Sequence, residues 1–178
     1  MPEILNPTDL EIRLLNSKCE QSKFDCGVKE VNSWFRQKTS KHHGRYTYRT
    51  HTAHLRGNDN PCGFYTLRLA NGDAKYLSPE DSARHGPTDN FPAVQLTYIG
   101  VEKYQQGCGI GRILMGDVID KFYNIANLAG AFALTLVAID KDTAEFYRRL
   151  GFTAYGPNKD RPMMLLPAKS VFDLYEGD

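Results

Sequence analysis

The 178-residue chain has no apolar run that approaches the length of a membrane-spanning helix, which needs about eighteen residues or more. Its first residues, MPEILNPTDLEIRLL, contain neither the basic region nor the small-residue cleavage site of a signal peptide. Cysteine is scarce too, and Cys19, Cys26, Cys62 and Cys108 form no C-x-x-C pair and have no histidine pair beside them to complete a zinc site. We therefore expect free thiols, no bound metal, no membrane association and a cytoplasmic location.

Acidic residues are missing from one stretch of the chain, although the formal net charge of the whole is only +1. No Asp or Glu occurs from Val31 to Asn58, where four of the five histidines are found. The cations of this stretch are Arg36, Lys38, Lys41, Arg45, Arg49 and Arg56. Such a stretch either follows the phosphates of a nucleic acid or forms a solvated surface.

Length and hydrophobic periodicity predict a single α/β domain over residues 1–178. Strands are expected at residues 10–15, 46–56, 62–70, 93–101, 131–139, 152–154 and 162–166. Helices are expected from Asp25, as the N-cap, to Thr39, and over residues 109–126 and 140–150. Residues 71–92, which include three prolines, predict a long loop or a weakly helical insertion. This order predicts a mixed sheet with one central βαβ unit.

Three glycines lie between the apolar strand at residues 93–101 and the helix that follows it, in the sequence QGCGIG. A strand, a glycine turn and a helix N-terminus present backbone N–H groups and a positive dipole end to a phosphate. A P-loop would need Lys and then Ser or Thr after the last glycine, whereas Arg112 and Ile113 follow here. The G-x-G-x-G spacing also differs from the dinucleotide fingerprint G-x-G-x-x-G.

Read as Q-x-x-G-x-G, this loop resembles the acetyl-CoA pyrophosphate loop of the GNAT N-acetyltransferases. The segment from Phe146 to Phe152 also resembles the family pattern F-Y-x-x-x-G-F. The resemblance implies the GNAT fold, which is an α/β fold whose mixed central sheet has a splayed strand pair and flanking helices. It also implies acetyl-CoA as co-substrate and N-acetyl transfer as the activity.

The same resemblance implies roles for individual residues. The backbone of Ile99 and Val101 would pair with pantetheine and bind the thioester oxygen, and Tyr147 would be the general acid for the departing thiolate. The pyrophosphate would be bound by Gln106, Gly107, Cys108, Gly109, Ile110, Gly111 and Arg112. The strand AVQLTYIGV holds no carboxylate for a general base, and Glu102 is a candidate only through a water. Without a general base, the acceptor must already be partly unprotonated near neutral pH. This favours an α-amine, with a pKa of about 8, over a lysine amine, with a pKa of about 10.4, as the acceptor.

A second resemblance concerns the acceptor. Phe24-Asp25-Cys26-Gly27 followed by Trp34-Phe35 is similar to the F-x-C-G and W-L segments of the toxin-type GNATs. That resemblance implies aminoacyl-tRNA as the substrate and a ribbon-helix-helix antitoxin as a partner, and we also expect a homodimer. The candidate tRNA-binding residues are Arg36, Lys38, Arg45 and Arg49. Tyr98 stands where the toxin-type proteins usually have Arg.

Two other functions stay open. An N-acetyltransferase of a small amine, such as a polyamine or an amino sugar, would need acidic residues in its pocket. The candidates for these are Asp73, Glu80, Asp81 and Asp89. A catalytically silent acetyl-CoA-binding module would keep the glycine loop without needing Tyr147.

Overall fold

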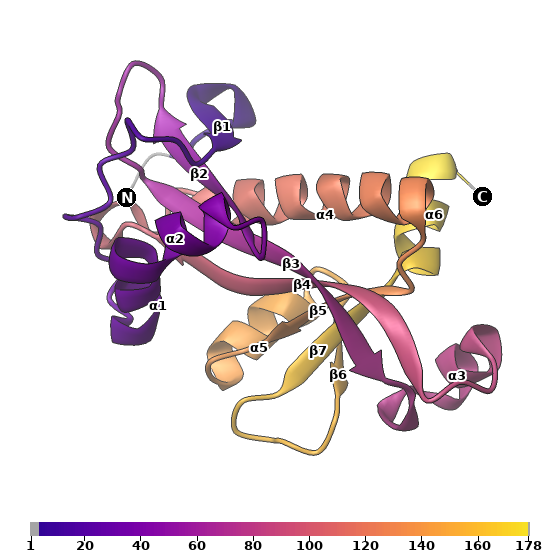
Figure 1. Cartoon of the computed structure of the whole chain (residues 1–178). Coiled ribbons are helices and arrows are strands. Elements are labelled where there is room, and N and C mark those ends of the chain that lie inside the picture. The colour runs from indigo at the N-terminus through magenta and orange to yellow at the C-terminus, as the bar shows by residue number, and fades with distance from the viewer. Residues whose placement is uncertain (1–3, 178) are drawn as a thin grey trace. The chain divides into compact units, whose positions relative to one another are not determined.

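The computed structural model describes residues 4–177, and its seven strands hydrogen-bond in the order β1-β2-β3-β4-β5-β7-β6 (Figure 1). The sheet is mixed, as predicted, because β4 and β5 are parallel whereas β5 and β7 are antiparallel. The chain divides into two compact units. The first comprises Met1–Arg68 and Thr97–Val118, and the second comprises Leu69–Leu96 and Ile119–Asp178.

The first unit contains an antiparallel meander covered by a broken helix. Its elements are η1 (Pro7–Asp9), β1 (Leu10–Leu14), α1 (Lys29–Ser33), η2 (Trp34–Lys38), α2 (Thr39–Gly44), β2 (Arg49–Leu55) and η4 (Lys103–Gln105). It also holds the beginning of β3 (Gly63–Asp73), the end of β4 (Asn90–Val101) and the beginning of α4 (Ile110–Ala129). The strands predicted at residues 46–56 and 62–70 form a hairpin, since β2 pairs with β3 from Arg49 opposite Leu67 to Ala53 opposite Gly63.

The second unit is built around β5 (Ala133–Val137), whose first four residues are buried. This explains the unbroken apolar sequence of the strand. The other elements are η3 (Ala74–Tyr76), α3 (Pro79–His85), α5 (Lys141–Arg148), β6 (Thr153–Tyr155), β7 (Met163–Pro167) and α6 (Ala168–Glu176). Strand β5 pairs with β4 in parallel from Ala93 opposite Ala133 to Leu96 opposite Leu136, and β4 continues to Val101 beyond the last of these pairs. This short pairing agrees with the splayed strand pair of the GNAT fold.

The first helix differs from its prediction. Asp25 does not cap it; α1 begins at Lys29 after Val28, and the helical segment continues through the π-helical turn η2 to Gly44. The physical reason is that the Asp25 carboxylate accepts a hydrogen bond from the N–H of Gly27 instead of from a helix N–H.

Residues 71–92 are more ordered than a long loop, because β3 continues to Asp73 and β4 already begins at Asn90. Between these strands lie η3 and α3. Gly72 is required in β3, since a Cβ there would lie 2.0 Å from Cζ of Phe91. Helix α6 has no counterpart among the predicted elements. Within residues 4–177, none of the helices combines the length and the apolar character that a membrane crossing requires.

Candidate functional site

The glycine loop forms the turn between β4 and α4. Gly107 and Gly109 have φ values of +82° and +85°, which side chains disfavour. The N–H groups of Arg112 and Ile113 both donate to the Gly109 carbonyl, at 3.1 and 3.2 Å, and so close the first turn of α4. Within residues 4–177, the backbone N–H groups of residues 108–111 donate to no acceptor. A turn with free donors at the N-terminus of a 20-residue helix suits an anion.

The space around the loop also fits a pyrophosphate. A Cβ at Gly111 would meet only Cγ2 of Val101, at 4.0 Å, so backbone and ligand oxygens have room to approach each other there. The Arg112 side chain is exposed at the start of α4, where it adds a positive charge. Cys108 is half-buried, and its carbonyl accepts a hydrogen bond from the Leu5 N–H at 2.9 Å. The N-terminal segment therefore supports the loop at Cys108.

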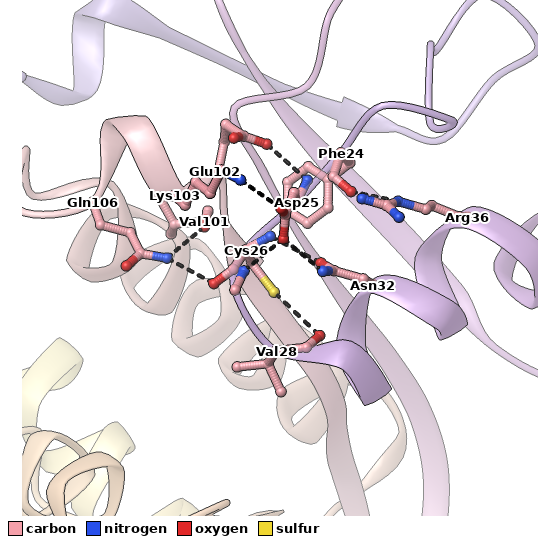
Figure 2. A network of polar contacts seen from close by, with 11 residues as sticks. Phe24, Asp25, Cys26, Val28, Asn32, Arg36, Val101, Glu102, Lys103 and Gln106 are labelled. Carbon is pink, nitrogen blue, oxygen red and sulfur yellow. Dashed lines mark hydrogen bonds and ion pairs between the residues drawn. The ribbon is translucent and has the colours of Figure 1, made fainter.

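The side chain of Gln106 is bound to the protein itself. Figure 2 shows its side-chain amide donating to two carbonyls, those of Cys26 at 2.9 Å and of Val101 at 3.0 Å. The side chain thus joins the end of β4 to residues 24–27. The Val101 carbonyl is likewise in use, which leaves its N–H for the pantetheine role.

Asp25 is the centre of the network in Figure 2. Its carboxylate accepts from the Gly27 N–H at 2.9 Å and from the Asn32 side-chain amide at 2.7 Å, and Oδ2 lies 2.7 Å from Nζ of Lys103. The Lys103 hydrogen bond, followed by those of Gly27 and Asn32, holds the pKa of Asp25 well below its usual value. The Glu102 carboxylate accepts from the Asp25 N–H at 2.8 Å, which makes it a structural partner of this segment.

Tyr147 lies on α5, which begins where the Asp140 side chain accepts from the Thr143 N–H at 2.7 Å. The ring is only 4% exposed and packs edge-on against Phe146 and Phe152, with centroids 5.3 and 5.7 Å away. Burial raises the pKa of the phenol far above its usual value. The hydroxyl therefore keeps its proton at neutral pH.

The predicted tRNA-binding cations all belong to the helical segment α1-η2-α2 and to the turn and strand that follow it. Lys38 and Arg45 are exposed. Arg36 is exposed as well, and its Nε donates to the Phe24 carbonyl, so this cation is anchored to the Asp25 segment. Arg49 is half-buried and donates through Nη1 to the His43 carbonyl at 3.5 Å.

An aromatic stack that joins the helical segment to β4 was not predicted. Trp34 is stacked between Tyr98 of β4, at a centroid distance of 4.5 Å, and His42 of α2, at 5.1 Å. Tyr48 packs against the same ring at 5.0 Å. The sequence did contain one sign of this stack, which is Tyr98. The toxin-type proteins usually have Arg at this position, and an aromatic residue there is expected to pack against a different partner.

The acidic residues of the alternative reading are engaged locally. Asp73 pairs with Lys75 at 2.7 Å, while Glu80 and Asp81 both pair with Arg84 at 2.9 Å. Three of the four candidate carboxylates are thus paired with cations close to them in the sequence. This weakens the case for a polyamine pocket there.

The structure thus places a glycine turn, whose backbone donors suit an anion, between β4 and α4 of a mixed seven-stranded α/β sheet. The chain belongs to the acetyltransferase (GNAT) family, whose model matches residues 12–152. It is 28% identical over 104 residues to the tRNA-acetylating toxin of Mycobacterium tuberculosis. This match covers 58% of the chain and 61% of the toxin, which is less than two thirds of the relative's length.

Solved structures share the fold over nearly the whole chain. A tyrosine-to-phenylalanine mutant of KacT has a TM-score of 0.86 at 23% identity, covering 93% of this chain and 99% of that one. AtaT complexed with acetyl-methionyl-tRNAfMet has a TM-score of 0.85 at 22% identity, covering 94% and 99%. AtaTR bound with acetyl-CoA has a TM-score of 0.80 at 22% identity, with the same coverage. At these identities the likeness establishes the fold, and the GNAT fold predicted for the sequence is confirmed.

Proposed function

We propose that this chain is an acetyl-CoA-dependent N-acetyltransferase, a single GNAT domain that acetylates the α-amine of aminoacyl-tRNA and so inhibits translation. The observation that carries the proposal is a group of exposed cations in the acid-free stretch Val31–Asn58, namely Arg36, Lys38, Lys41 and Arg45. Arg36 links this stretch, through the Phe24 carbonyl and the Asp25 network, to the turn before the glycine loop. A cationic surface bound to the cofactor loop suits a polyanionic acceptor. The similarity to a tRNA-acetylating toxin and to a tRNA-bound AtaT supports the same acceptor.

Acetyl-CoA would supply the activated acetyl group as a thioester. The N–H groups of residues 108–111 and the Arg112 guanidinium would hold its pyrophosphate, and the backbone of Ile99 and Val101 would align pantetheine. Tyr147 would act as the general acid that gives its proton to the departing sulfur. The acceptor α-amine is already partly neutral near pH 8. It therefore needs no strong base, and Glu102 is left to hold Asp25.

A toxin-type acetyltransferase also has characteristic partners. AtaT has been solved with the C-terminus of the antitoxin AtaR, and KacTA with DNA. By analogy we propose a ribbon-helix-helix antitoxin for this chain, a homodimeric assembly and a cytoplasmic site of action, where charged tRNA is found. Size-exclusion chromatography with light scattering tests the assembly; a monomeric mass at micromolar concentration excludes the homodimer.

The acceptor is tested with labelled acetyl-CoA. The full-length protein is incubated with total aminoacyl-tRNA, with the same tRNA after deacylation, and with a panel of polyamines and amino sugars. We expect label on the charged tRNA alone, at a rate that falls steeply with salt because phosphate contacts release counterions. Label on a small amine with none on charged tRNA overturns the proposal in favour of a small-molecule acetyltransferase. No transfer to any amine, with acetyl-CoA bound, identifies a silent module.

A further inference from the structure

We propose that Tyr46 is a stacking platform for an unpaired nucleobase near the single-stranded end of the RNA acceptor. The inference rests on the proposed function and assigns a specific residue to recognition of the acceptor. Tyr46 lies in the turn between α2 and β2, within the acid-free stretch Val31–Asn58.

The backbone of Tyr46 is held in an unfavourable conformation. Its φ of +59° makes it the one residue other than glycine with a positive φ in the part of the chain that the structure describes. A bulky residue at such an angle is uncommon, and strained residues of this kind cluster at functional sites. Its N–H donates to the His43 carbonyl at 3.2 Å, so the turn is closed behind the strained residue. The ring of this strained residue is 80% exposed.

The charges around the ring suit a nucleic acid. The guanidinium carbon of Arg49 lies 5.2 Å from the centroid of the Tyr46 ring, and Arg49 is itself tied to the same turn through the His43 carbonyl. Arg45 and Lys41 are exposed nearby in the sequence. Proteins that bind single strands combine cations for the phosphates with an exposed aromatic face for a base. The turn offers both within a few residues.

A series of aromatic contacts leads from β4 towards this turn. Tyr98, next to Ile99 on β4, stacks on Trp34, and Trp34 packs against Tyr48, two residues after Tyr46. The Tyr48 hydroxyl accepts from Nη1 of Arg68 at 3.1 Å. All of these residues belong to the first unit. The series therefore connects β4 to the segment that follows the Tyr46 turn, and we infer that an acceptor whose reactive end lies at β4 extends over the surface towards Tyr46.

A substitution series separates the ring from the strain. Tyr46→Phe keeps the aromatic face, Tyr46→Ala removes it, and Tyr46→Gly removes it while relieving the positive φ. The matched control is Tyr76→Ala, because Tyr76 also has a cation near its ring, with Lys75 Nζ 4.7 Å from the centroid, but lies beside acidic Asp73. Steady-state kinetics are measured for each full-length variant with both substrates.

We expect the Ala and Gly variants to raise KM for aminoacyl-tRNA by about five- to tenfold, with KM for acetyl-CoA unchanged. Tyr46→Phe and Tyr76→Ala should stay within about twofold of the wild type, and Tyr46→Gly should be at least as heat-stable as the wild type. A wild-type KM for charged tRNA in both the Ala and the Gly variant overturns the stacking proposal while the proposed function stands.

A binding assay tests the stacking proposal separately from the proposed function. If the wild type does not acetylate charged tRNA, filter binding of a short single-stranded oligoadenylate at low salt still tests the platform. Tighter binding by the wild type than by Tyr46→Gly supports stacking, and equal binding overturns it. Weakened binding of the antitoxin in Tyr46→Gly, with oligoadenylate binding unchanged, assigns the residue to a protein interface and also overturns the proposal.

Discussion

Lys103 and Asp25 are joined twice: Nζ of Lys103 lies 2.7 Å from Oδ2 of Asp25, and the Lys103 N–H donates to the Asp25 carbonyl at 2.8 Å. These two contacts fix residues 24–27 to the first turn after β4, immediately before the glycine loop. An exposed ion pair by itself adds little stability. Combined with a backbone hydrogen bond and the Gln106 link, it defines the position of the loop.

Asp25→Asn should weaken acetyl-CoA binding without slowing the chemistry. The substitution removes the charge that holds Lys103 but keeps an oxygen for the Gly27 and Asn32 donors. We expect KM for acetyl-CoA to rise by about two- to fivefold with kcat nearly unchanged. The control is Asp73→Asn, which breaks the equivalent 2.7 Å pair with Lys75 away from the loop. Equal acetyl-CoA KM values in Asp25→Asn and the wild type would show that the pair does not position the loop.

Tyr147→Phe tests the general acid. The hydroxyl is the only group that the change removes, and the edge contacts with Phe146 and Phe152 are kept, so the fold should be preserved. We expect kcat to fall by about a hundredfold or more and KM for acetyl-CoA to stay within about twofold. The matched control is Tyr155→Phe, because Tyr155 is also buried but donates its hydroxyl to the Asp73 carbonyl. An unchanged kcat in Tyr147→Phe removes the acid role.

Most strands and the glycine loop could be predicted because their signals are local. The apolar run of β5 follows from burial of both faces of the strand. The family patterns around Gly109 and Tyr147 are also short. The prediction of mixed α/β topology needed nothing beyond the order of these segments.

The errors occurred where a side chain has a distant partner. Asp25 looks like an N-cap within its own segment, but Lys103 and Glu102, which lie far along the chain, determine what it binds. The stack of Tyr98 on Trp34 likewise joins a strand to a helix that is distant in sequence. The same is true of the buried hydroxyl chain in which Thr50 contacts both Thr39 and Thr66 at 2.9 Å. Periodicity carries no information about such pairs.

His54 makes stability depend on pH. It is fully buried in β2, and its Nε2 lies 2.9 Å from the Thr52 hydroxyl. Burial, helped by the Arg13 charge, lowers the pKa of His54 below its usual value of 6.5. The unfolded chain therefore binds the proton first, so the contribution of neutral His54 is complete above about pH 6.5 and declines as the pH falls below it.

Urea unfolding at pH 7.5 and pH 5.5 measures this effect. We expect the free energy of unfolding to fall between these pH values in the wild type and to fall less in His54→Gln, which places a neutral hydrogen-bonding side chain in β2. Asp25→Asn serves as the control, because the depressed pKa of Asp25 confines its titration to more acidic solutions. Identical pH dependence in the wild type and in His54→Gln would contradict this assignment.

Two alanine substitutions in the glycine loop separate folding from ligand binding. Gly109 has a φ of +85°, so Gly109→Ala should destabilise the protein by about 1 kcal/mol or more. Gly111 lies inside the first turn of α4 with open space around it, and Gly111→Ala should stabilise the helix by about 0.5–1 kcal/mol. The new methyl group nevertheless occupies the space through which pyrophosphate oxygens would reach the backbone. If the loop binds acetyl-CoA as proposed, Gly111→Ala combines a higher melting temperature with a raised acetyl-CoA KM, measured by scanning calorimetry and steady-state kinetics. A stabilised variant with wild-type KM would mean that the glycine serves only the turn, and that the anion site lies elsewhere on the chain.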